Sequence, residues 1–190
     1  QAIETAKAKM THEWTFTNNT DLNDSVGSND VTLVGAFDTG VDYLSKDGIG
    51  TSIYAQLDST INIDMTQPFS LSFGMIKDGD DFNGALVDSS DTNFIVVGTT
   101  TSWGLRMRSS TGNEVDFDIT GVTITDMNHY VITYDGVTYK LYIDGNFKSN
   151  GVANGIPATI VLDRFCGGYL SSTNLEGGIT YVRTFDDSLT

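Results

Sequence analysis

The chain has 190 residues, which suits one domain with a single sizeable core better than two small ones. Its 25 acidic and 10 basic residues give a formal net charge of −15, and such a surface repels nucleic acid and anionic lipid. We therefore expect no nucleic-acid partner. No apolar run approaches the ~18 residues of a membrane span, so we expect no membrane insertion either. The abundance of Asp, Asn, Gly, Ser and Thr excludes a helical bundle, and a hydrophobic content of 39% excludes a disordered acidic tail.

The N-terminal segment differs from the rest of the chain. Residues 1–10 are rich in Ala, and Lys7 and Lys9 come late in the segment, which favours a helix. Ten residues are too few for a stable isolated helix, so we predict a short helical lead over 1–11, as a linker or the tail of a preceding region. The folded domain is expected over 12–190. Because the chain begins with Gln rather than Met, we also expect it to be a piece of a longer protein.

Short alternating apolar runs begin at Thr11, and turn residues separate them every eight to twelve residues, which is typical of an antiparallel sandwich. The clearest run, His129–Phe147, contains Asp-Gly at 135–136 and at 144–145, and Asp-Gly supplies the positive φ angles of a tight hairpin. We predict a three-stranded meander there. The side chains predicted to share the buried face of its middle strand are Tyr139, Leu141 and Ile143. The other predicted strands are His12–Thr17, Ser52–Leu57, Phe69–Ile76, Gly84–Val87, Asn93–Gly98, Gly104–Ser109, Glu114–Ile119, Thr159–Asp163 and Ile179–Phe185.

The opening of this region resembles a known family. His12–Phe16 (HEWTF), Asp21–Ser25 (DLNDS) and Asn29–Gly35 (NDVTLVG) resemble the start of the laminin-G-like jelly rolls of the concanavalin A-like lectin/glucanase superfamily. Later segments fit the same order, and the match covers residues 12–189, although Thr180 stands where the family often has an acid. These later segments are Phe69–Phe73, His129–Gly136, Lys140–Gly145, Gly167-Gly168 and Glu176–Phe185. The resemblance implies an all-β, two-sheet antiparallel jelly-roll sandwich with ligand sites in loops along a rim. It does not imply one function.

Two Asp-rich loops, 78–83 and 88–93, supply many oxygen atoms over short spans. Ca²⁺ takes six to eight such oxygen ligands. Neither loop has the spacing of a helix–loop–helix calcium site, but laminin-G-like domains often hold one calcium ion at a rim loop. The resemblance therefore implies a Ca²⁺ site, whereas ordinary Asp turns, in which each side chain bonds its own backbone, remain an alternative. The candidate metal ligands are Asp80, Asp81, Asp88 and Asp91.

Glu114, Asp116 and Asp118 alternate along one predicted strand and so share a face. They resemble the E-x-D-x-E motif of family-sixteen glycoside hydrolases, in which the first acid is the nucleophile and the last is the acid/base. A retaining pair needs carboxyl groups about 5–5.5 Å apart, whereas positions i and i+4 of a strand start about 13 Å apart. Asp118 is also one methylene shorter than the Glu of the motif, and the chain has only two tryptophans. We expect no glycosidase activity and keep catalysis by these three acids as the alternative.

Other residues suggest ligand contacts or a structural role. Tyr169, with Ser171 and Asn174 close by, combines an aromatic face with short polar groups, which suits sugar recognition. Trp14 and Trp103 are expected to pack in the core, and His12 and His129 to be solvated or satisfied strand residues rather than metal ligands. A single cysteine, Cys166, excludes a disulfide framework and is expected to be a small buried apolar residue.

Together these features predict a non-catalytic carbohydrate-binding or adhesion domain on a phage virion or another extracellular appendage. Its expected partner is a glycan or a host cell-surface receptor, bound through rim loops, with other virion proteins as further partners. The alternatives are a glycoside hydrolase related to the family-sixteen glucanases and a purely structural virion domain. The expected location is extracellular or the virion surface.

Overall fold

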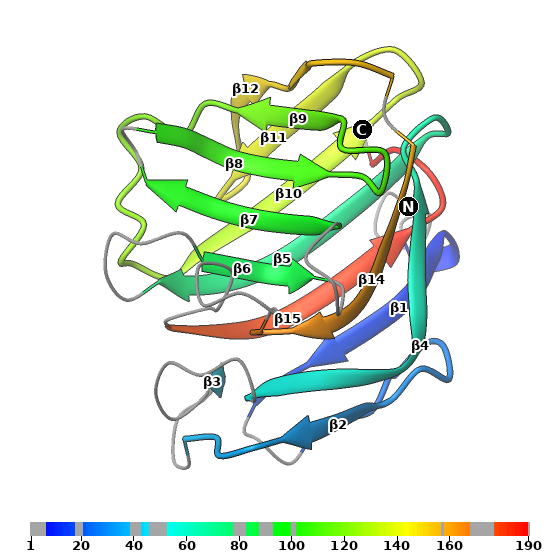
Figure 1. Ribbon diagram of the computed structural model, residues 1–190, viewed down its shortest axis with the longest axis vertical. Coiled ribbons are helices and arrows are strands. Elements are labelled where there is room, and N and C mark those ends of the chain that lie inside the picture. The colour runs from blue at the N-terminus through cyan, green and yellow to red at the C-terminus, as the bar shows by residue number, and fades with distance from the viewer. Residues whose placement is uncertain are drawn as a thin grey trace.

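The computed structural model describes residues 7–17, 21–38, 43–45, 53–77, 83–87, 93–99, 102–156, 158–167 and 177–189. Over these residues the fold is all-β and consists of two antiparallel sheets packed face to face (Figure 1). This confirms the predicted sandwich, and the finer jelly-roll assignment stays a prediction. None of the described residues lies in a helix long and apolar enough to span a membrane.

The seven-stranded sheet has the order β1-β15-β5-β10-β11-β12, with β3 also pairing with β15. Its strands are β1 (Met10–Thr15), β3 (Leu44–Ser45), β5 (Phe69–Lys77), β10 (Asn128–Tyr134), β11 (Tyr139–Ile143), β12 (Asn146–Asn150) and β15 (Gly177–Phe185). The eight-stranded sheet has the order β13-β9-β8-β7-β6-β14-β4-β2. Its strands are β2 (Val31–Val34), β4 (Tyr54–Asp64), β6 (Asn83–Val87), β7 (Phe94–Thr99), β8 (Ser102–Arg108), β9 (Glu114–Phe117), β13 (Val152–Ala153) and β14 (Thr159–Phe165).

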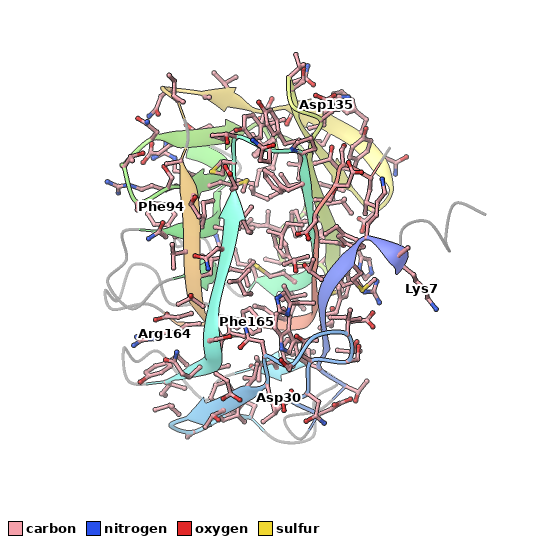
Figure 2. The ribbon with its side chains drawn as sticks, turned by 90° about the vertical axis from the view of Figure 1, so that its right-hand side faces the viewer. Lys7, Asp30, Phe94, Asp135, Arg164 and Phe165 are labelled. Carbon is pink, nitrogen blue, oxygen red and sulfur yellow. The ribbon has the colours of Figure 1, made fainter. Side chains whose placement is uncertain are left out.

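The core lies between the two sheets and is built by alternation along the strands. Leu71, Phe73 and Met75 of β5 are buried, as are Ile61 and Ile63 of β4 in the facing sheet. Figure 2 shows Phe165 between the sheets, whereas Phe94 and Arg164 lie on the outward side of the eight-stranded sheet. Trp14 is fully buried and its indole N–H donates to the carbonyl of Asn29 at 2.7 Å, so its predicted core role is confirmed. The side chain of Trp103 lies outside the described residues.

The predicted meander is confirmed as β10, β11 and β12, and its two turns differ. Ile143 pairs with Asn146, so Asp144 and Gly145 form a two-residue loop, and their φ angles of 51° and 77° are those of a type I′ turn. In the other turn Tyr134 pairs with Tyr139, which leaves a four-residue loop, 135–138. There the carboxylate of Asp135 accepts hydrogen bonds from the backbone N–H groups of residues 137 and 138, at 3.0 and 2.8 Å.

Several predicted boundaries change in the structure. In the part of the expected helical lead that is described, only residues 7 and 8 have helical backbone, and β1 already begins at Met10. The strand predicted over Ser52–Leu57 continues to Asp64. The strand predicted over Glu114–Ile119 ends at Phe117, so Asp118 lies beyond it. Cys166 is buried, as expected, just after β14.

The buried face of β11 gives a test of the fold. Leu141 is fully buried, so Leu141→Ala should lower the free energy of unfolding by about 3 kcal/mol, because a cavity replaces the lost methyl groups. Val137 is 86% exposed, so the control Val137→Ala should change it by less than about 0.5 kcal/mol. Urea unfolding measures both. Equal effects of the two substitutions would show that this strand face is not buried.

Candidate functional site

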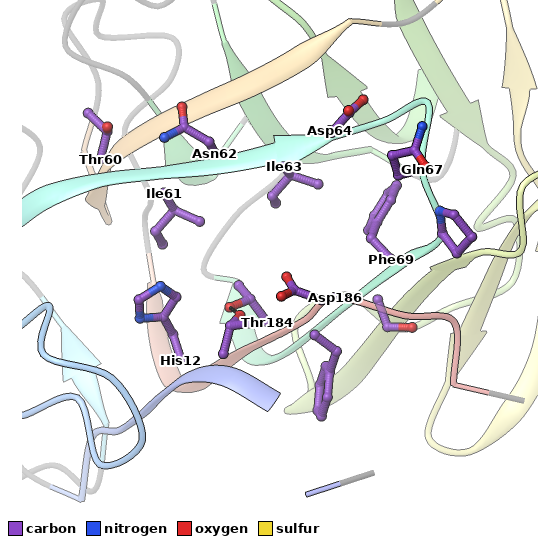
Figure 3. A pocket seen from close by; sticks show the side chains of 14 residues that line it. His12, Thr60, Ile61, Asn62, Ile63, Asp64, Gln67, Phe69, Thr184 and Asp186 are labelled. Carbon is purple, nitrogen blue, oxygen red and sulfur yellow. Dashed lines mark hydrogen bonds between the residues drawn. The ribbon is translucent and has the colours of Figure 1, made fainter. Parts of the chain in front are cut away.

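A cleft of about 420 Å³ opens where the edges of the two sheets face each other (Figure 3). Strand β2 pairs with β4 only as far as Leu57, so among the described strands the segment from Thr60 to Asp64 has β14 on one side and no partner on the other. Opposite it lie β1 and the end of β15. We call this hollow the edge cleft.

The two walls of the edge cleft differ in chemistry. One wall is apolar: Ile61 and Ile63 of β4 point toward the cleft in Figure 3, with Phe69 beside them. The other wall is polar and carries His12, Thr184 and Asp186. Asn62 points to the far side of β4 in the same view. The cleft therefore offers an apolar surface facing hydrogen-bonding groups, a combination found in small-molecule sites.

Thr184 and its neighbours make the polar wall. The hydroxyl of Thr184 lies 2.6 Å from that of Thr11 on the adjacent strand, so one donates to the other. The backbone N–H of Asp186 donates to the carbonyl of Lys9 at 3.1 Å, which holds the exposed Asp186 at the cleft. Lys9 also pairs with Asp187. The wall is thus fixed by bonds across the first and last described strands of the chain.

His12 is fixed by a partner that the sequence analysis did not find. Its Nδ1 lies 2.5 Å from a carboxylate oxygen of Asp24, and its ring stacks on Trp14 with centroids 5.2 Å apart and planes 13° apart. The side chain of Asp24 is fully buried, whereas that of His12 is 27% exposed. Because an ionised carboxylate only accepts hydrogen bonds, Nδ1 carries the proton and donates to Asp24. The other ring nitrogen, Nε2, does not bond Asp24.

Asp24 also organises the loop that follows β1. Its carboxylate accepts hydrogen bonds from the backbone N–H groups of Glu13, Val26 and Gly27, at 3.0, 3.2 and 2.9 Å. Burial by itself raises the pKa of Asp24, but the hydrogen bonds from His12 and from these backbone groups outweigh it, so the pKa is lowered. The carboxylate is therefore ionised in the folded protein at neutral pH.

The same loop reaches the opposite sheet. The backbone carbonyl of Asn29 accepts a hydrogen bond from the indole N–H of Trp14. The side-chain amide of Asn29 makes two hydrogen bonds of 2.8 Å to the backbone of Ser59. Trp14 belongs to the seven-stranded sheet and Ser59 to the eight-stranded sheet. Loop residues 22–30 therefore bridge the two sheets at the edge where the cleft opens.

Asp24→Asn should lower the free energy of unfolding by about 2 kcal/mol, because an amide cannot replace a buried charge that accepts several hydrogen bonds. The folded pKa of Asp24 is lowered, so its contribution is full above the unfolded value of 3.8 and is lost as the pH falls through the folded value. The difference between native chain and variant should then shrink as the pH falls below about 5 and on through the folded pKa of Asp24.

Urea unfolding at a series of pH values measures this difference. The control is Asp21→Asn, an exposed residue of the same segment, which should change stability by less than about 0.5 kcal/mol. A difference between the native chain and Asp24→Asn that stays constant with pH would contradict the role given to the ionised carboxylate.

The three alternating acids occupy a different part of the molecule. Glu114 and Asp116 share the outward face of β9, as predicted, but Arg106 of β8 lies with both of them. Its Nε and Nη2 donate to the carboxylate of Asp116 at 2.6 and 2.8 Å, and its Nη1 lies 3.0 Å from Glu114. Asp118 lies beyond the strand and accepts a hydrogen bond from the backbone N–H of Thr120. One guanidinium thus engages two acids of the motif, and the third is separate from the strand.

The remaining predicted site residues lie outside the described residues. These are Asp80, Asp81, Asp88 and Asp91 for calcium, and Tyr169, Ser171 and Asn174 for a sugar. Within the described ranges, no group of three or more His, Cys, Asp or Glu side chains is placed to hold a metal ion. Neither His12 nor His129 therefore belongs to such a group among the described residues, and the ring of His129 stacks on Tyr181.

No protein-family model matches the sequence, and a search of curated proteins finds no match. Solved structures do resemble the fold. Domain 4 of AbnA, a GH43 extracellular arabinanase from Geobacillus stearothermophilus solved in complex with arabinotriose, has a TM-score of 0.61 at 19% identity. The alignment covers 96% of this chain and 94% of that chain.

Two larger proteins contain a similar sandwich. A Trypanosoma rangeli sialidase in complex with sialic acid has a TM-score of 0.61 at 15% identity, over 96% of this chain and 31% of that chain. Botulinum neurotoxin type C, whose cell entry depends on interaction with two ganglioside molecules, has a TM-score of 0.61 at 13% identity, over 99% of this chain and 50% of that chain. The chain therefore spans about a third of the sialidase and half of the neurotoxin chain. At such sequence identities the likeness shows the fold alone.

Proposed function

We propose that the chain is a non-catalytic, laminin-G-like carbohydrate-binding domain and that the edge cleft is one of its sugar sites. The observation that carries the proposal is the pairing of an apolar wall with a polar wall in one cleft of about 420 Å³. A sugar ring has apolar C–H faces and hydroxyl groups at its edges, so it can contact both walls at once. The hydrogen-bonding groups are held in place before the ligand arrives, which lowers the entropic cost of binding.

The charge of the site favours a neutral sugar. Asp186 lines the polar wall of the cleft, and the chain has a net charge of −15. A sugar carboxylate or sulfate would meet like charge there, which disfavours it. Hydroxyl groups of a neutral sugar can donate to Asp186 and bond the Thr184–Thr11 pair and Nε2 of His12.

Two further observations support a binding rather than a catalytic role. Arg106 engages Glu114 and Asp116, which leaves neither carboxylate placed as a nucleophile opposite Asp118. A similar domain of a glycoside hydrolase has also been solved with a short oligosaccharide. Glycoside hydrolysis remains the second candidate because the larger similar proteins include a sialidase. An extracellular appendage or phage virion is the proposed context, and a glycan or a host cell-surface receptor is the proposed partner.

Asp186→Asn should weaken binding of neutral trisaccharides at least tenfold, because it replaces a charged acceptor by a neutral one at the polar wall. Asp118→Asn, an exposed residue with the same change of charge, should leave binding unchanged. Isothermal titration with trisaccharides of arabinan, xylan, mannan, galactan and β-glucan measures both. Loss of affinity in Asp118→Asn but not in Asp186→Asn would overturn the cleft assignment. Reducing-sugar release that disappears in Glu114→Gln would favour the hydrolase.

A Ca²⁺ site at Asp80, Asp81, Asp88 or Asp91 remains a proposal that depends on the family resemblance. Clustered carboxylates repel one another, and a bound divalent ion relieves this repulsion in the folded state only. Calcium at about a hundred times its Kd should therefore stabilise the fold by about 2.7 kcal/mol and raise Tm, and a chelator should reverse the change. Magnesium should act less, because it dehydrates reluctantly. Equal shifts with calcium, magnesium and sodium chloride at matched ionic strength would show that only charge screening acts.

A further inference from the structure

The outer face of the seven-stranded sheet carries a continuous row of paired side chains that neither the edge cleft nor the core uses. The strand register places one residue of each strand directly beside the next across six strands. In order from β1 to β12 the row is Glu13, Arg183, Ser72, Val131, Tyr142 and Phe147. A shorter adjacent row pairs Tyr181, Gly74 and His129. We call the aromatic members of both rows, Tyr181, His129, Tyr142 and Phe147, the aromatic strip.

The ring of Tyr181 packs against Gly74 of the adjacent strand β5. A Cβ atom at Gly74 would lie 2.8 Å from the ring of Tyr181 and 2.1 Å from the hydroxyl of Thr180, so only glycine fits there. The hydroxyl of Tyr181 lies 3.1 Å from that of Ser72, the next outward residue of β5. The position of the ring is therefore set by contacts at both its edge and its hydroxyl.

Neighbouring side chains extend this surface. The ring of His129 stacks beside Tyr181, with centroids 5.7 Å apart and planes 21° apart. The guanidinium of Arg183 lies 4.7 Å from the centre of the Tyr181 ring and donates to Glu13 at 2.7 Å. The charges of Arg183 and Glu13 offset each other, so this end of the strip is locally close to neutral on a strongly acidic chain.

The other end of the strip is more exposed. Phe147 is 56% exposed and meets Tyr142 edge to face, with centroids 5.8 Å apart. A bulge between Leu141 and Tyr142 in the pairing of β11 with β12 leaves Lys148 without an opposite residue, and its ammonium bonds the carbonyl of Thr120. Beside Phe147 is a hollow of about 390 Å³ that Asp126, Asp144 and Asn146 also line. An exposed aromatic ring thus stands next to a hollow with polar groups.

We infer that the aromatic strip is a second carbohydrate surface, which binds an extended neutral glycan chain lying across the strands. From β15 to β12 the strip crosses four strand spacings, about 19 Å, which is longer than a single sugar ring. Aromatic side chains provide apolar contact along this length, and hydrogen-bonding groups lie at both ends. The local neutrality of the Glu13–Arg183 pair favours an uncharged chain. The inference rests on the proposed carbohydrate-binding function for its ligand class, but it concerns a different surface.

The test separates long from short ligands in the complete chain. Tyr142→Ala and Phe147→Ala should each weaken retention by immobilised linear arabinan, xylan, mannan, galactan or β-glucan at least tenfold, because aromatic anchors account for much of the energy of an interface. Both should leave binding of the corresponding trisaccharides to the edge cleft unchanged. Val152→Ala, 72% exposed on β13, is the matched control and should change neither. Thermal unfolding of every variant confirms that it is folded.

The outcomes distinguish the two proposals. If the polysaccharides bind and Tyr142→Ala and Phe147→Ala retain full affinity, or if no polysaccharide is retained by the native chain, the strip is not a glycan surface. Trisaccharide binding that Asp186→Asn abolishes then still upholds the edge cleft. Conversely, if polysaccharide retention depends on Phe147 and no trisaccharide binds, the assignment of the aromatic strip is upheld and that of the edge cleft is overturned.

Discussion

A buried carboxylate ties the two sheets together at the edge where they open. Asp24 accepts hydrogen bonds from His12 and from four backbone N–H groups, and this holds the loop after β1 in one conformation. Asn29 of that loop then bonds Trp14 on one sheet and Ser59 on the other. The separation of the cleft walls is therefore set by fixed polar contacts as well as by the packing of the apolar core. Because Asp24 is buried and ionised, losing any of these donors would leave a charge poorly compensated.

The edge cleft and the outer face that carries the aromatic strip lie on opposite sides of β1 and β15, and they differ in shape. Along β1, His12 faces the edge cleft and the next residue, Glu13, faces the outer side of the sheet. Along β15, Thr184 faces the cleft and Arg183 the outer side. The alternation of a β-strand thus gives one pair of strands two chemically distinct faces. A short amphipathic cleft suits one or a few sugar units, and a flat aromatic strip suits the length of a chain, so the two surfaces complement each other for a polymeric glycan.

The sequence predicted what depends on local pattern and missed what depends on register. Alternation and Asp-Gly turns identified the meander and the buried face of β11, because both signals lie within a few residues. The partnership of His12 with Asp24, and that of Arg106 with Glu114 and Asp116, requires knowing which residues pair between strands and loops. The predicted strand wrongly included Asp118. Strand β9 ends one residue earlier, at Phe117, and the carboxylate of Asp118 accepts a hydrogen bond from the backbone N–H of Thr120. The predicted calcium and Tyr169 sites stay predictions, since they fall outside the described residues.

Asp24 fixes the ring of His12 before any ligand binds. Nitrogen-15 NMR of the imidazole rings of the free protein, at about pH 9 where an ordinary imidazole is neutral, tests it most directly. We expect His12 to carry its proton on Nδ1, with a protected Nδ1–H signal that disappears in Asp24→Asn, and we expect Nε2 to have the shift of an unprotonated nitrogen. A His12 ring protonated on Nε2, or one whose signals are the same in the native chain and in Asp24→Asn, would show that Asp24 does not fix this ring.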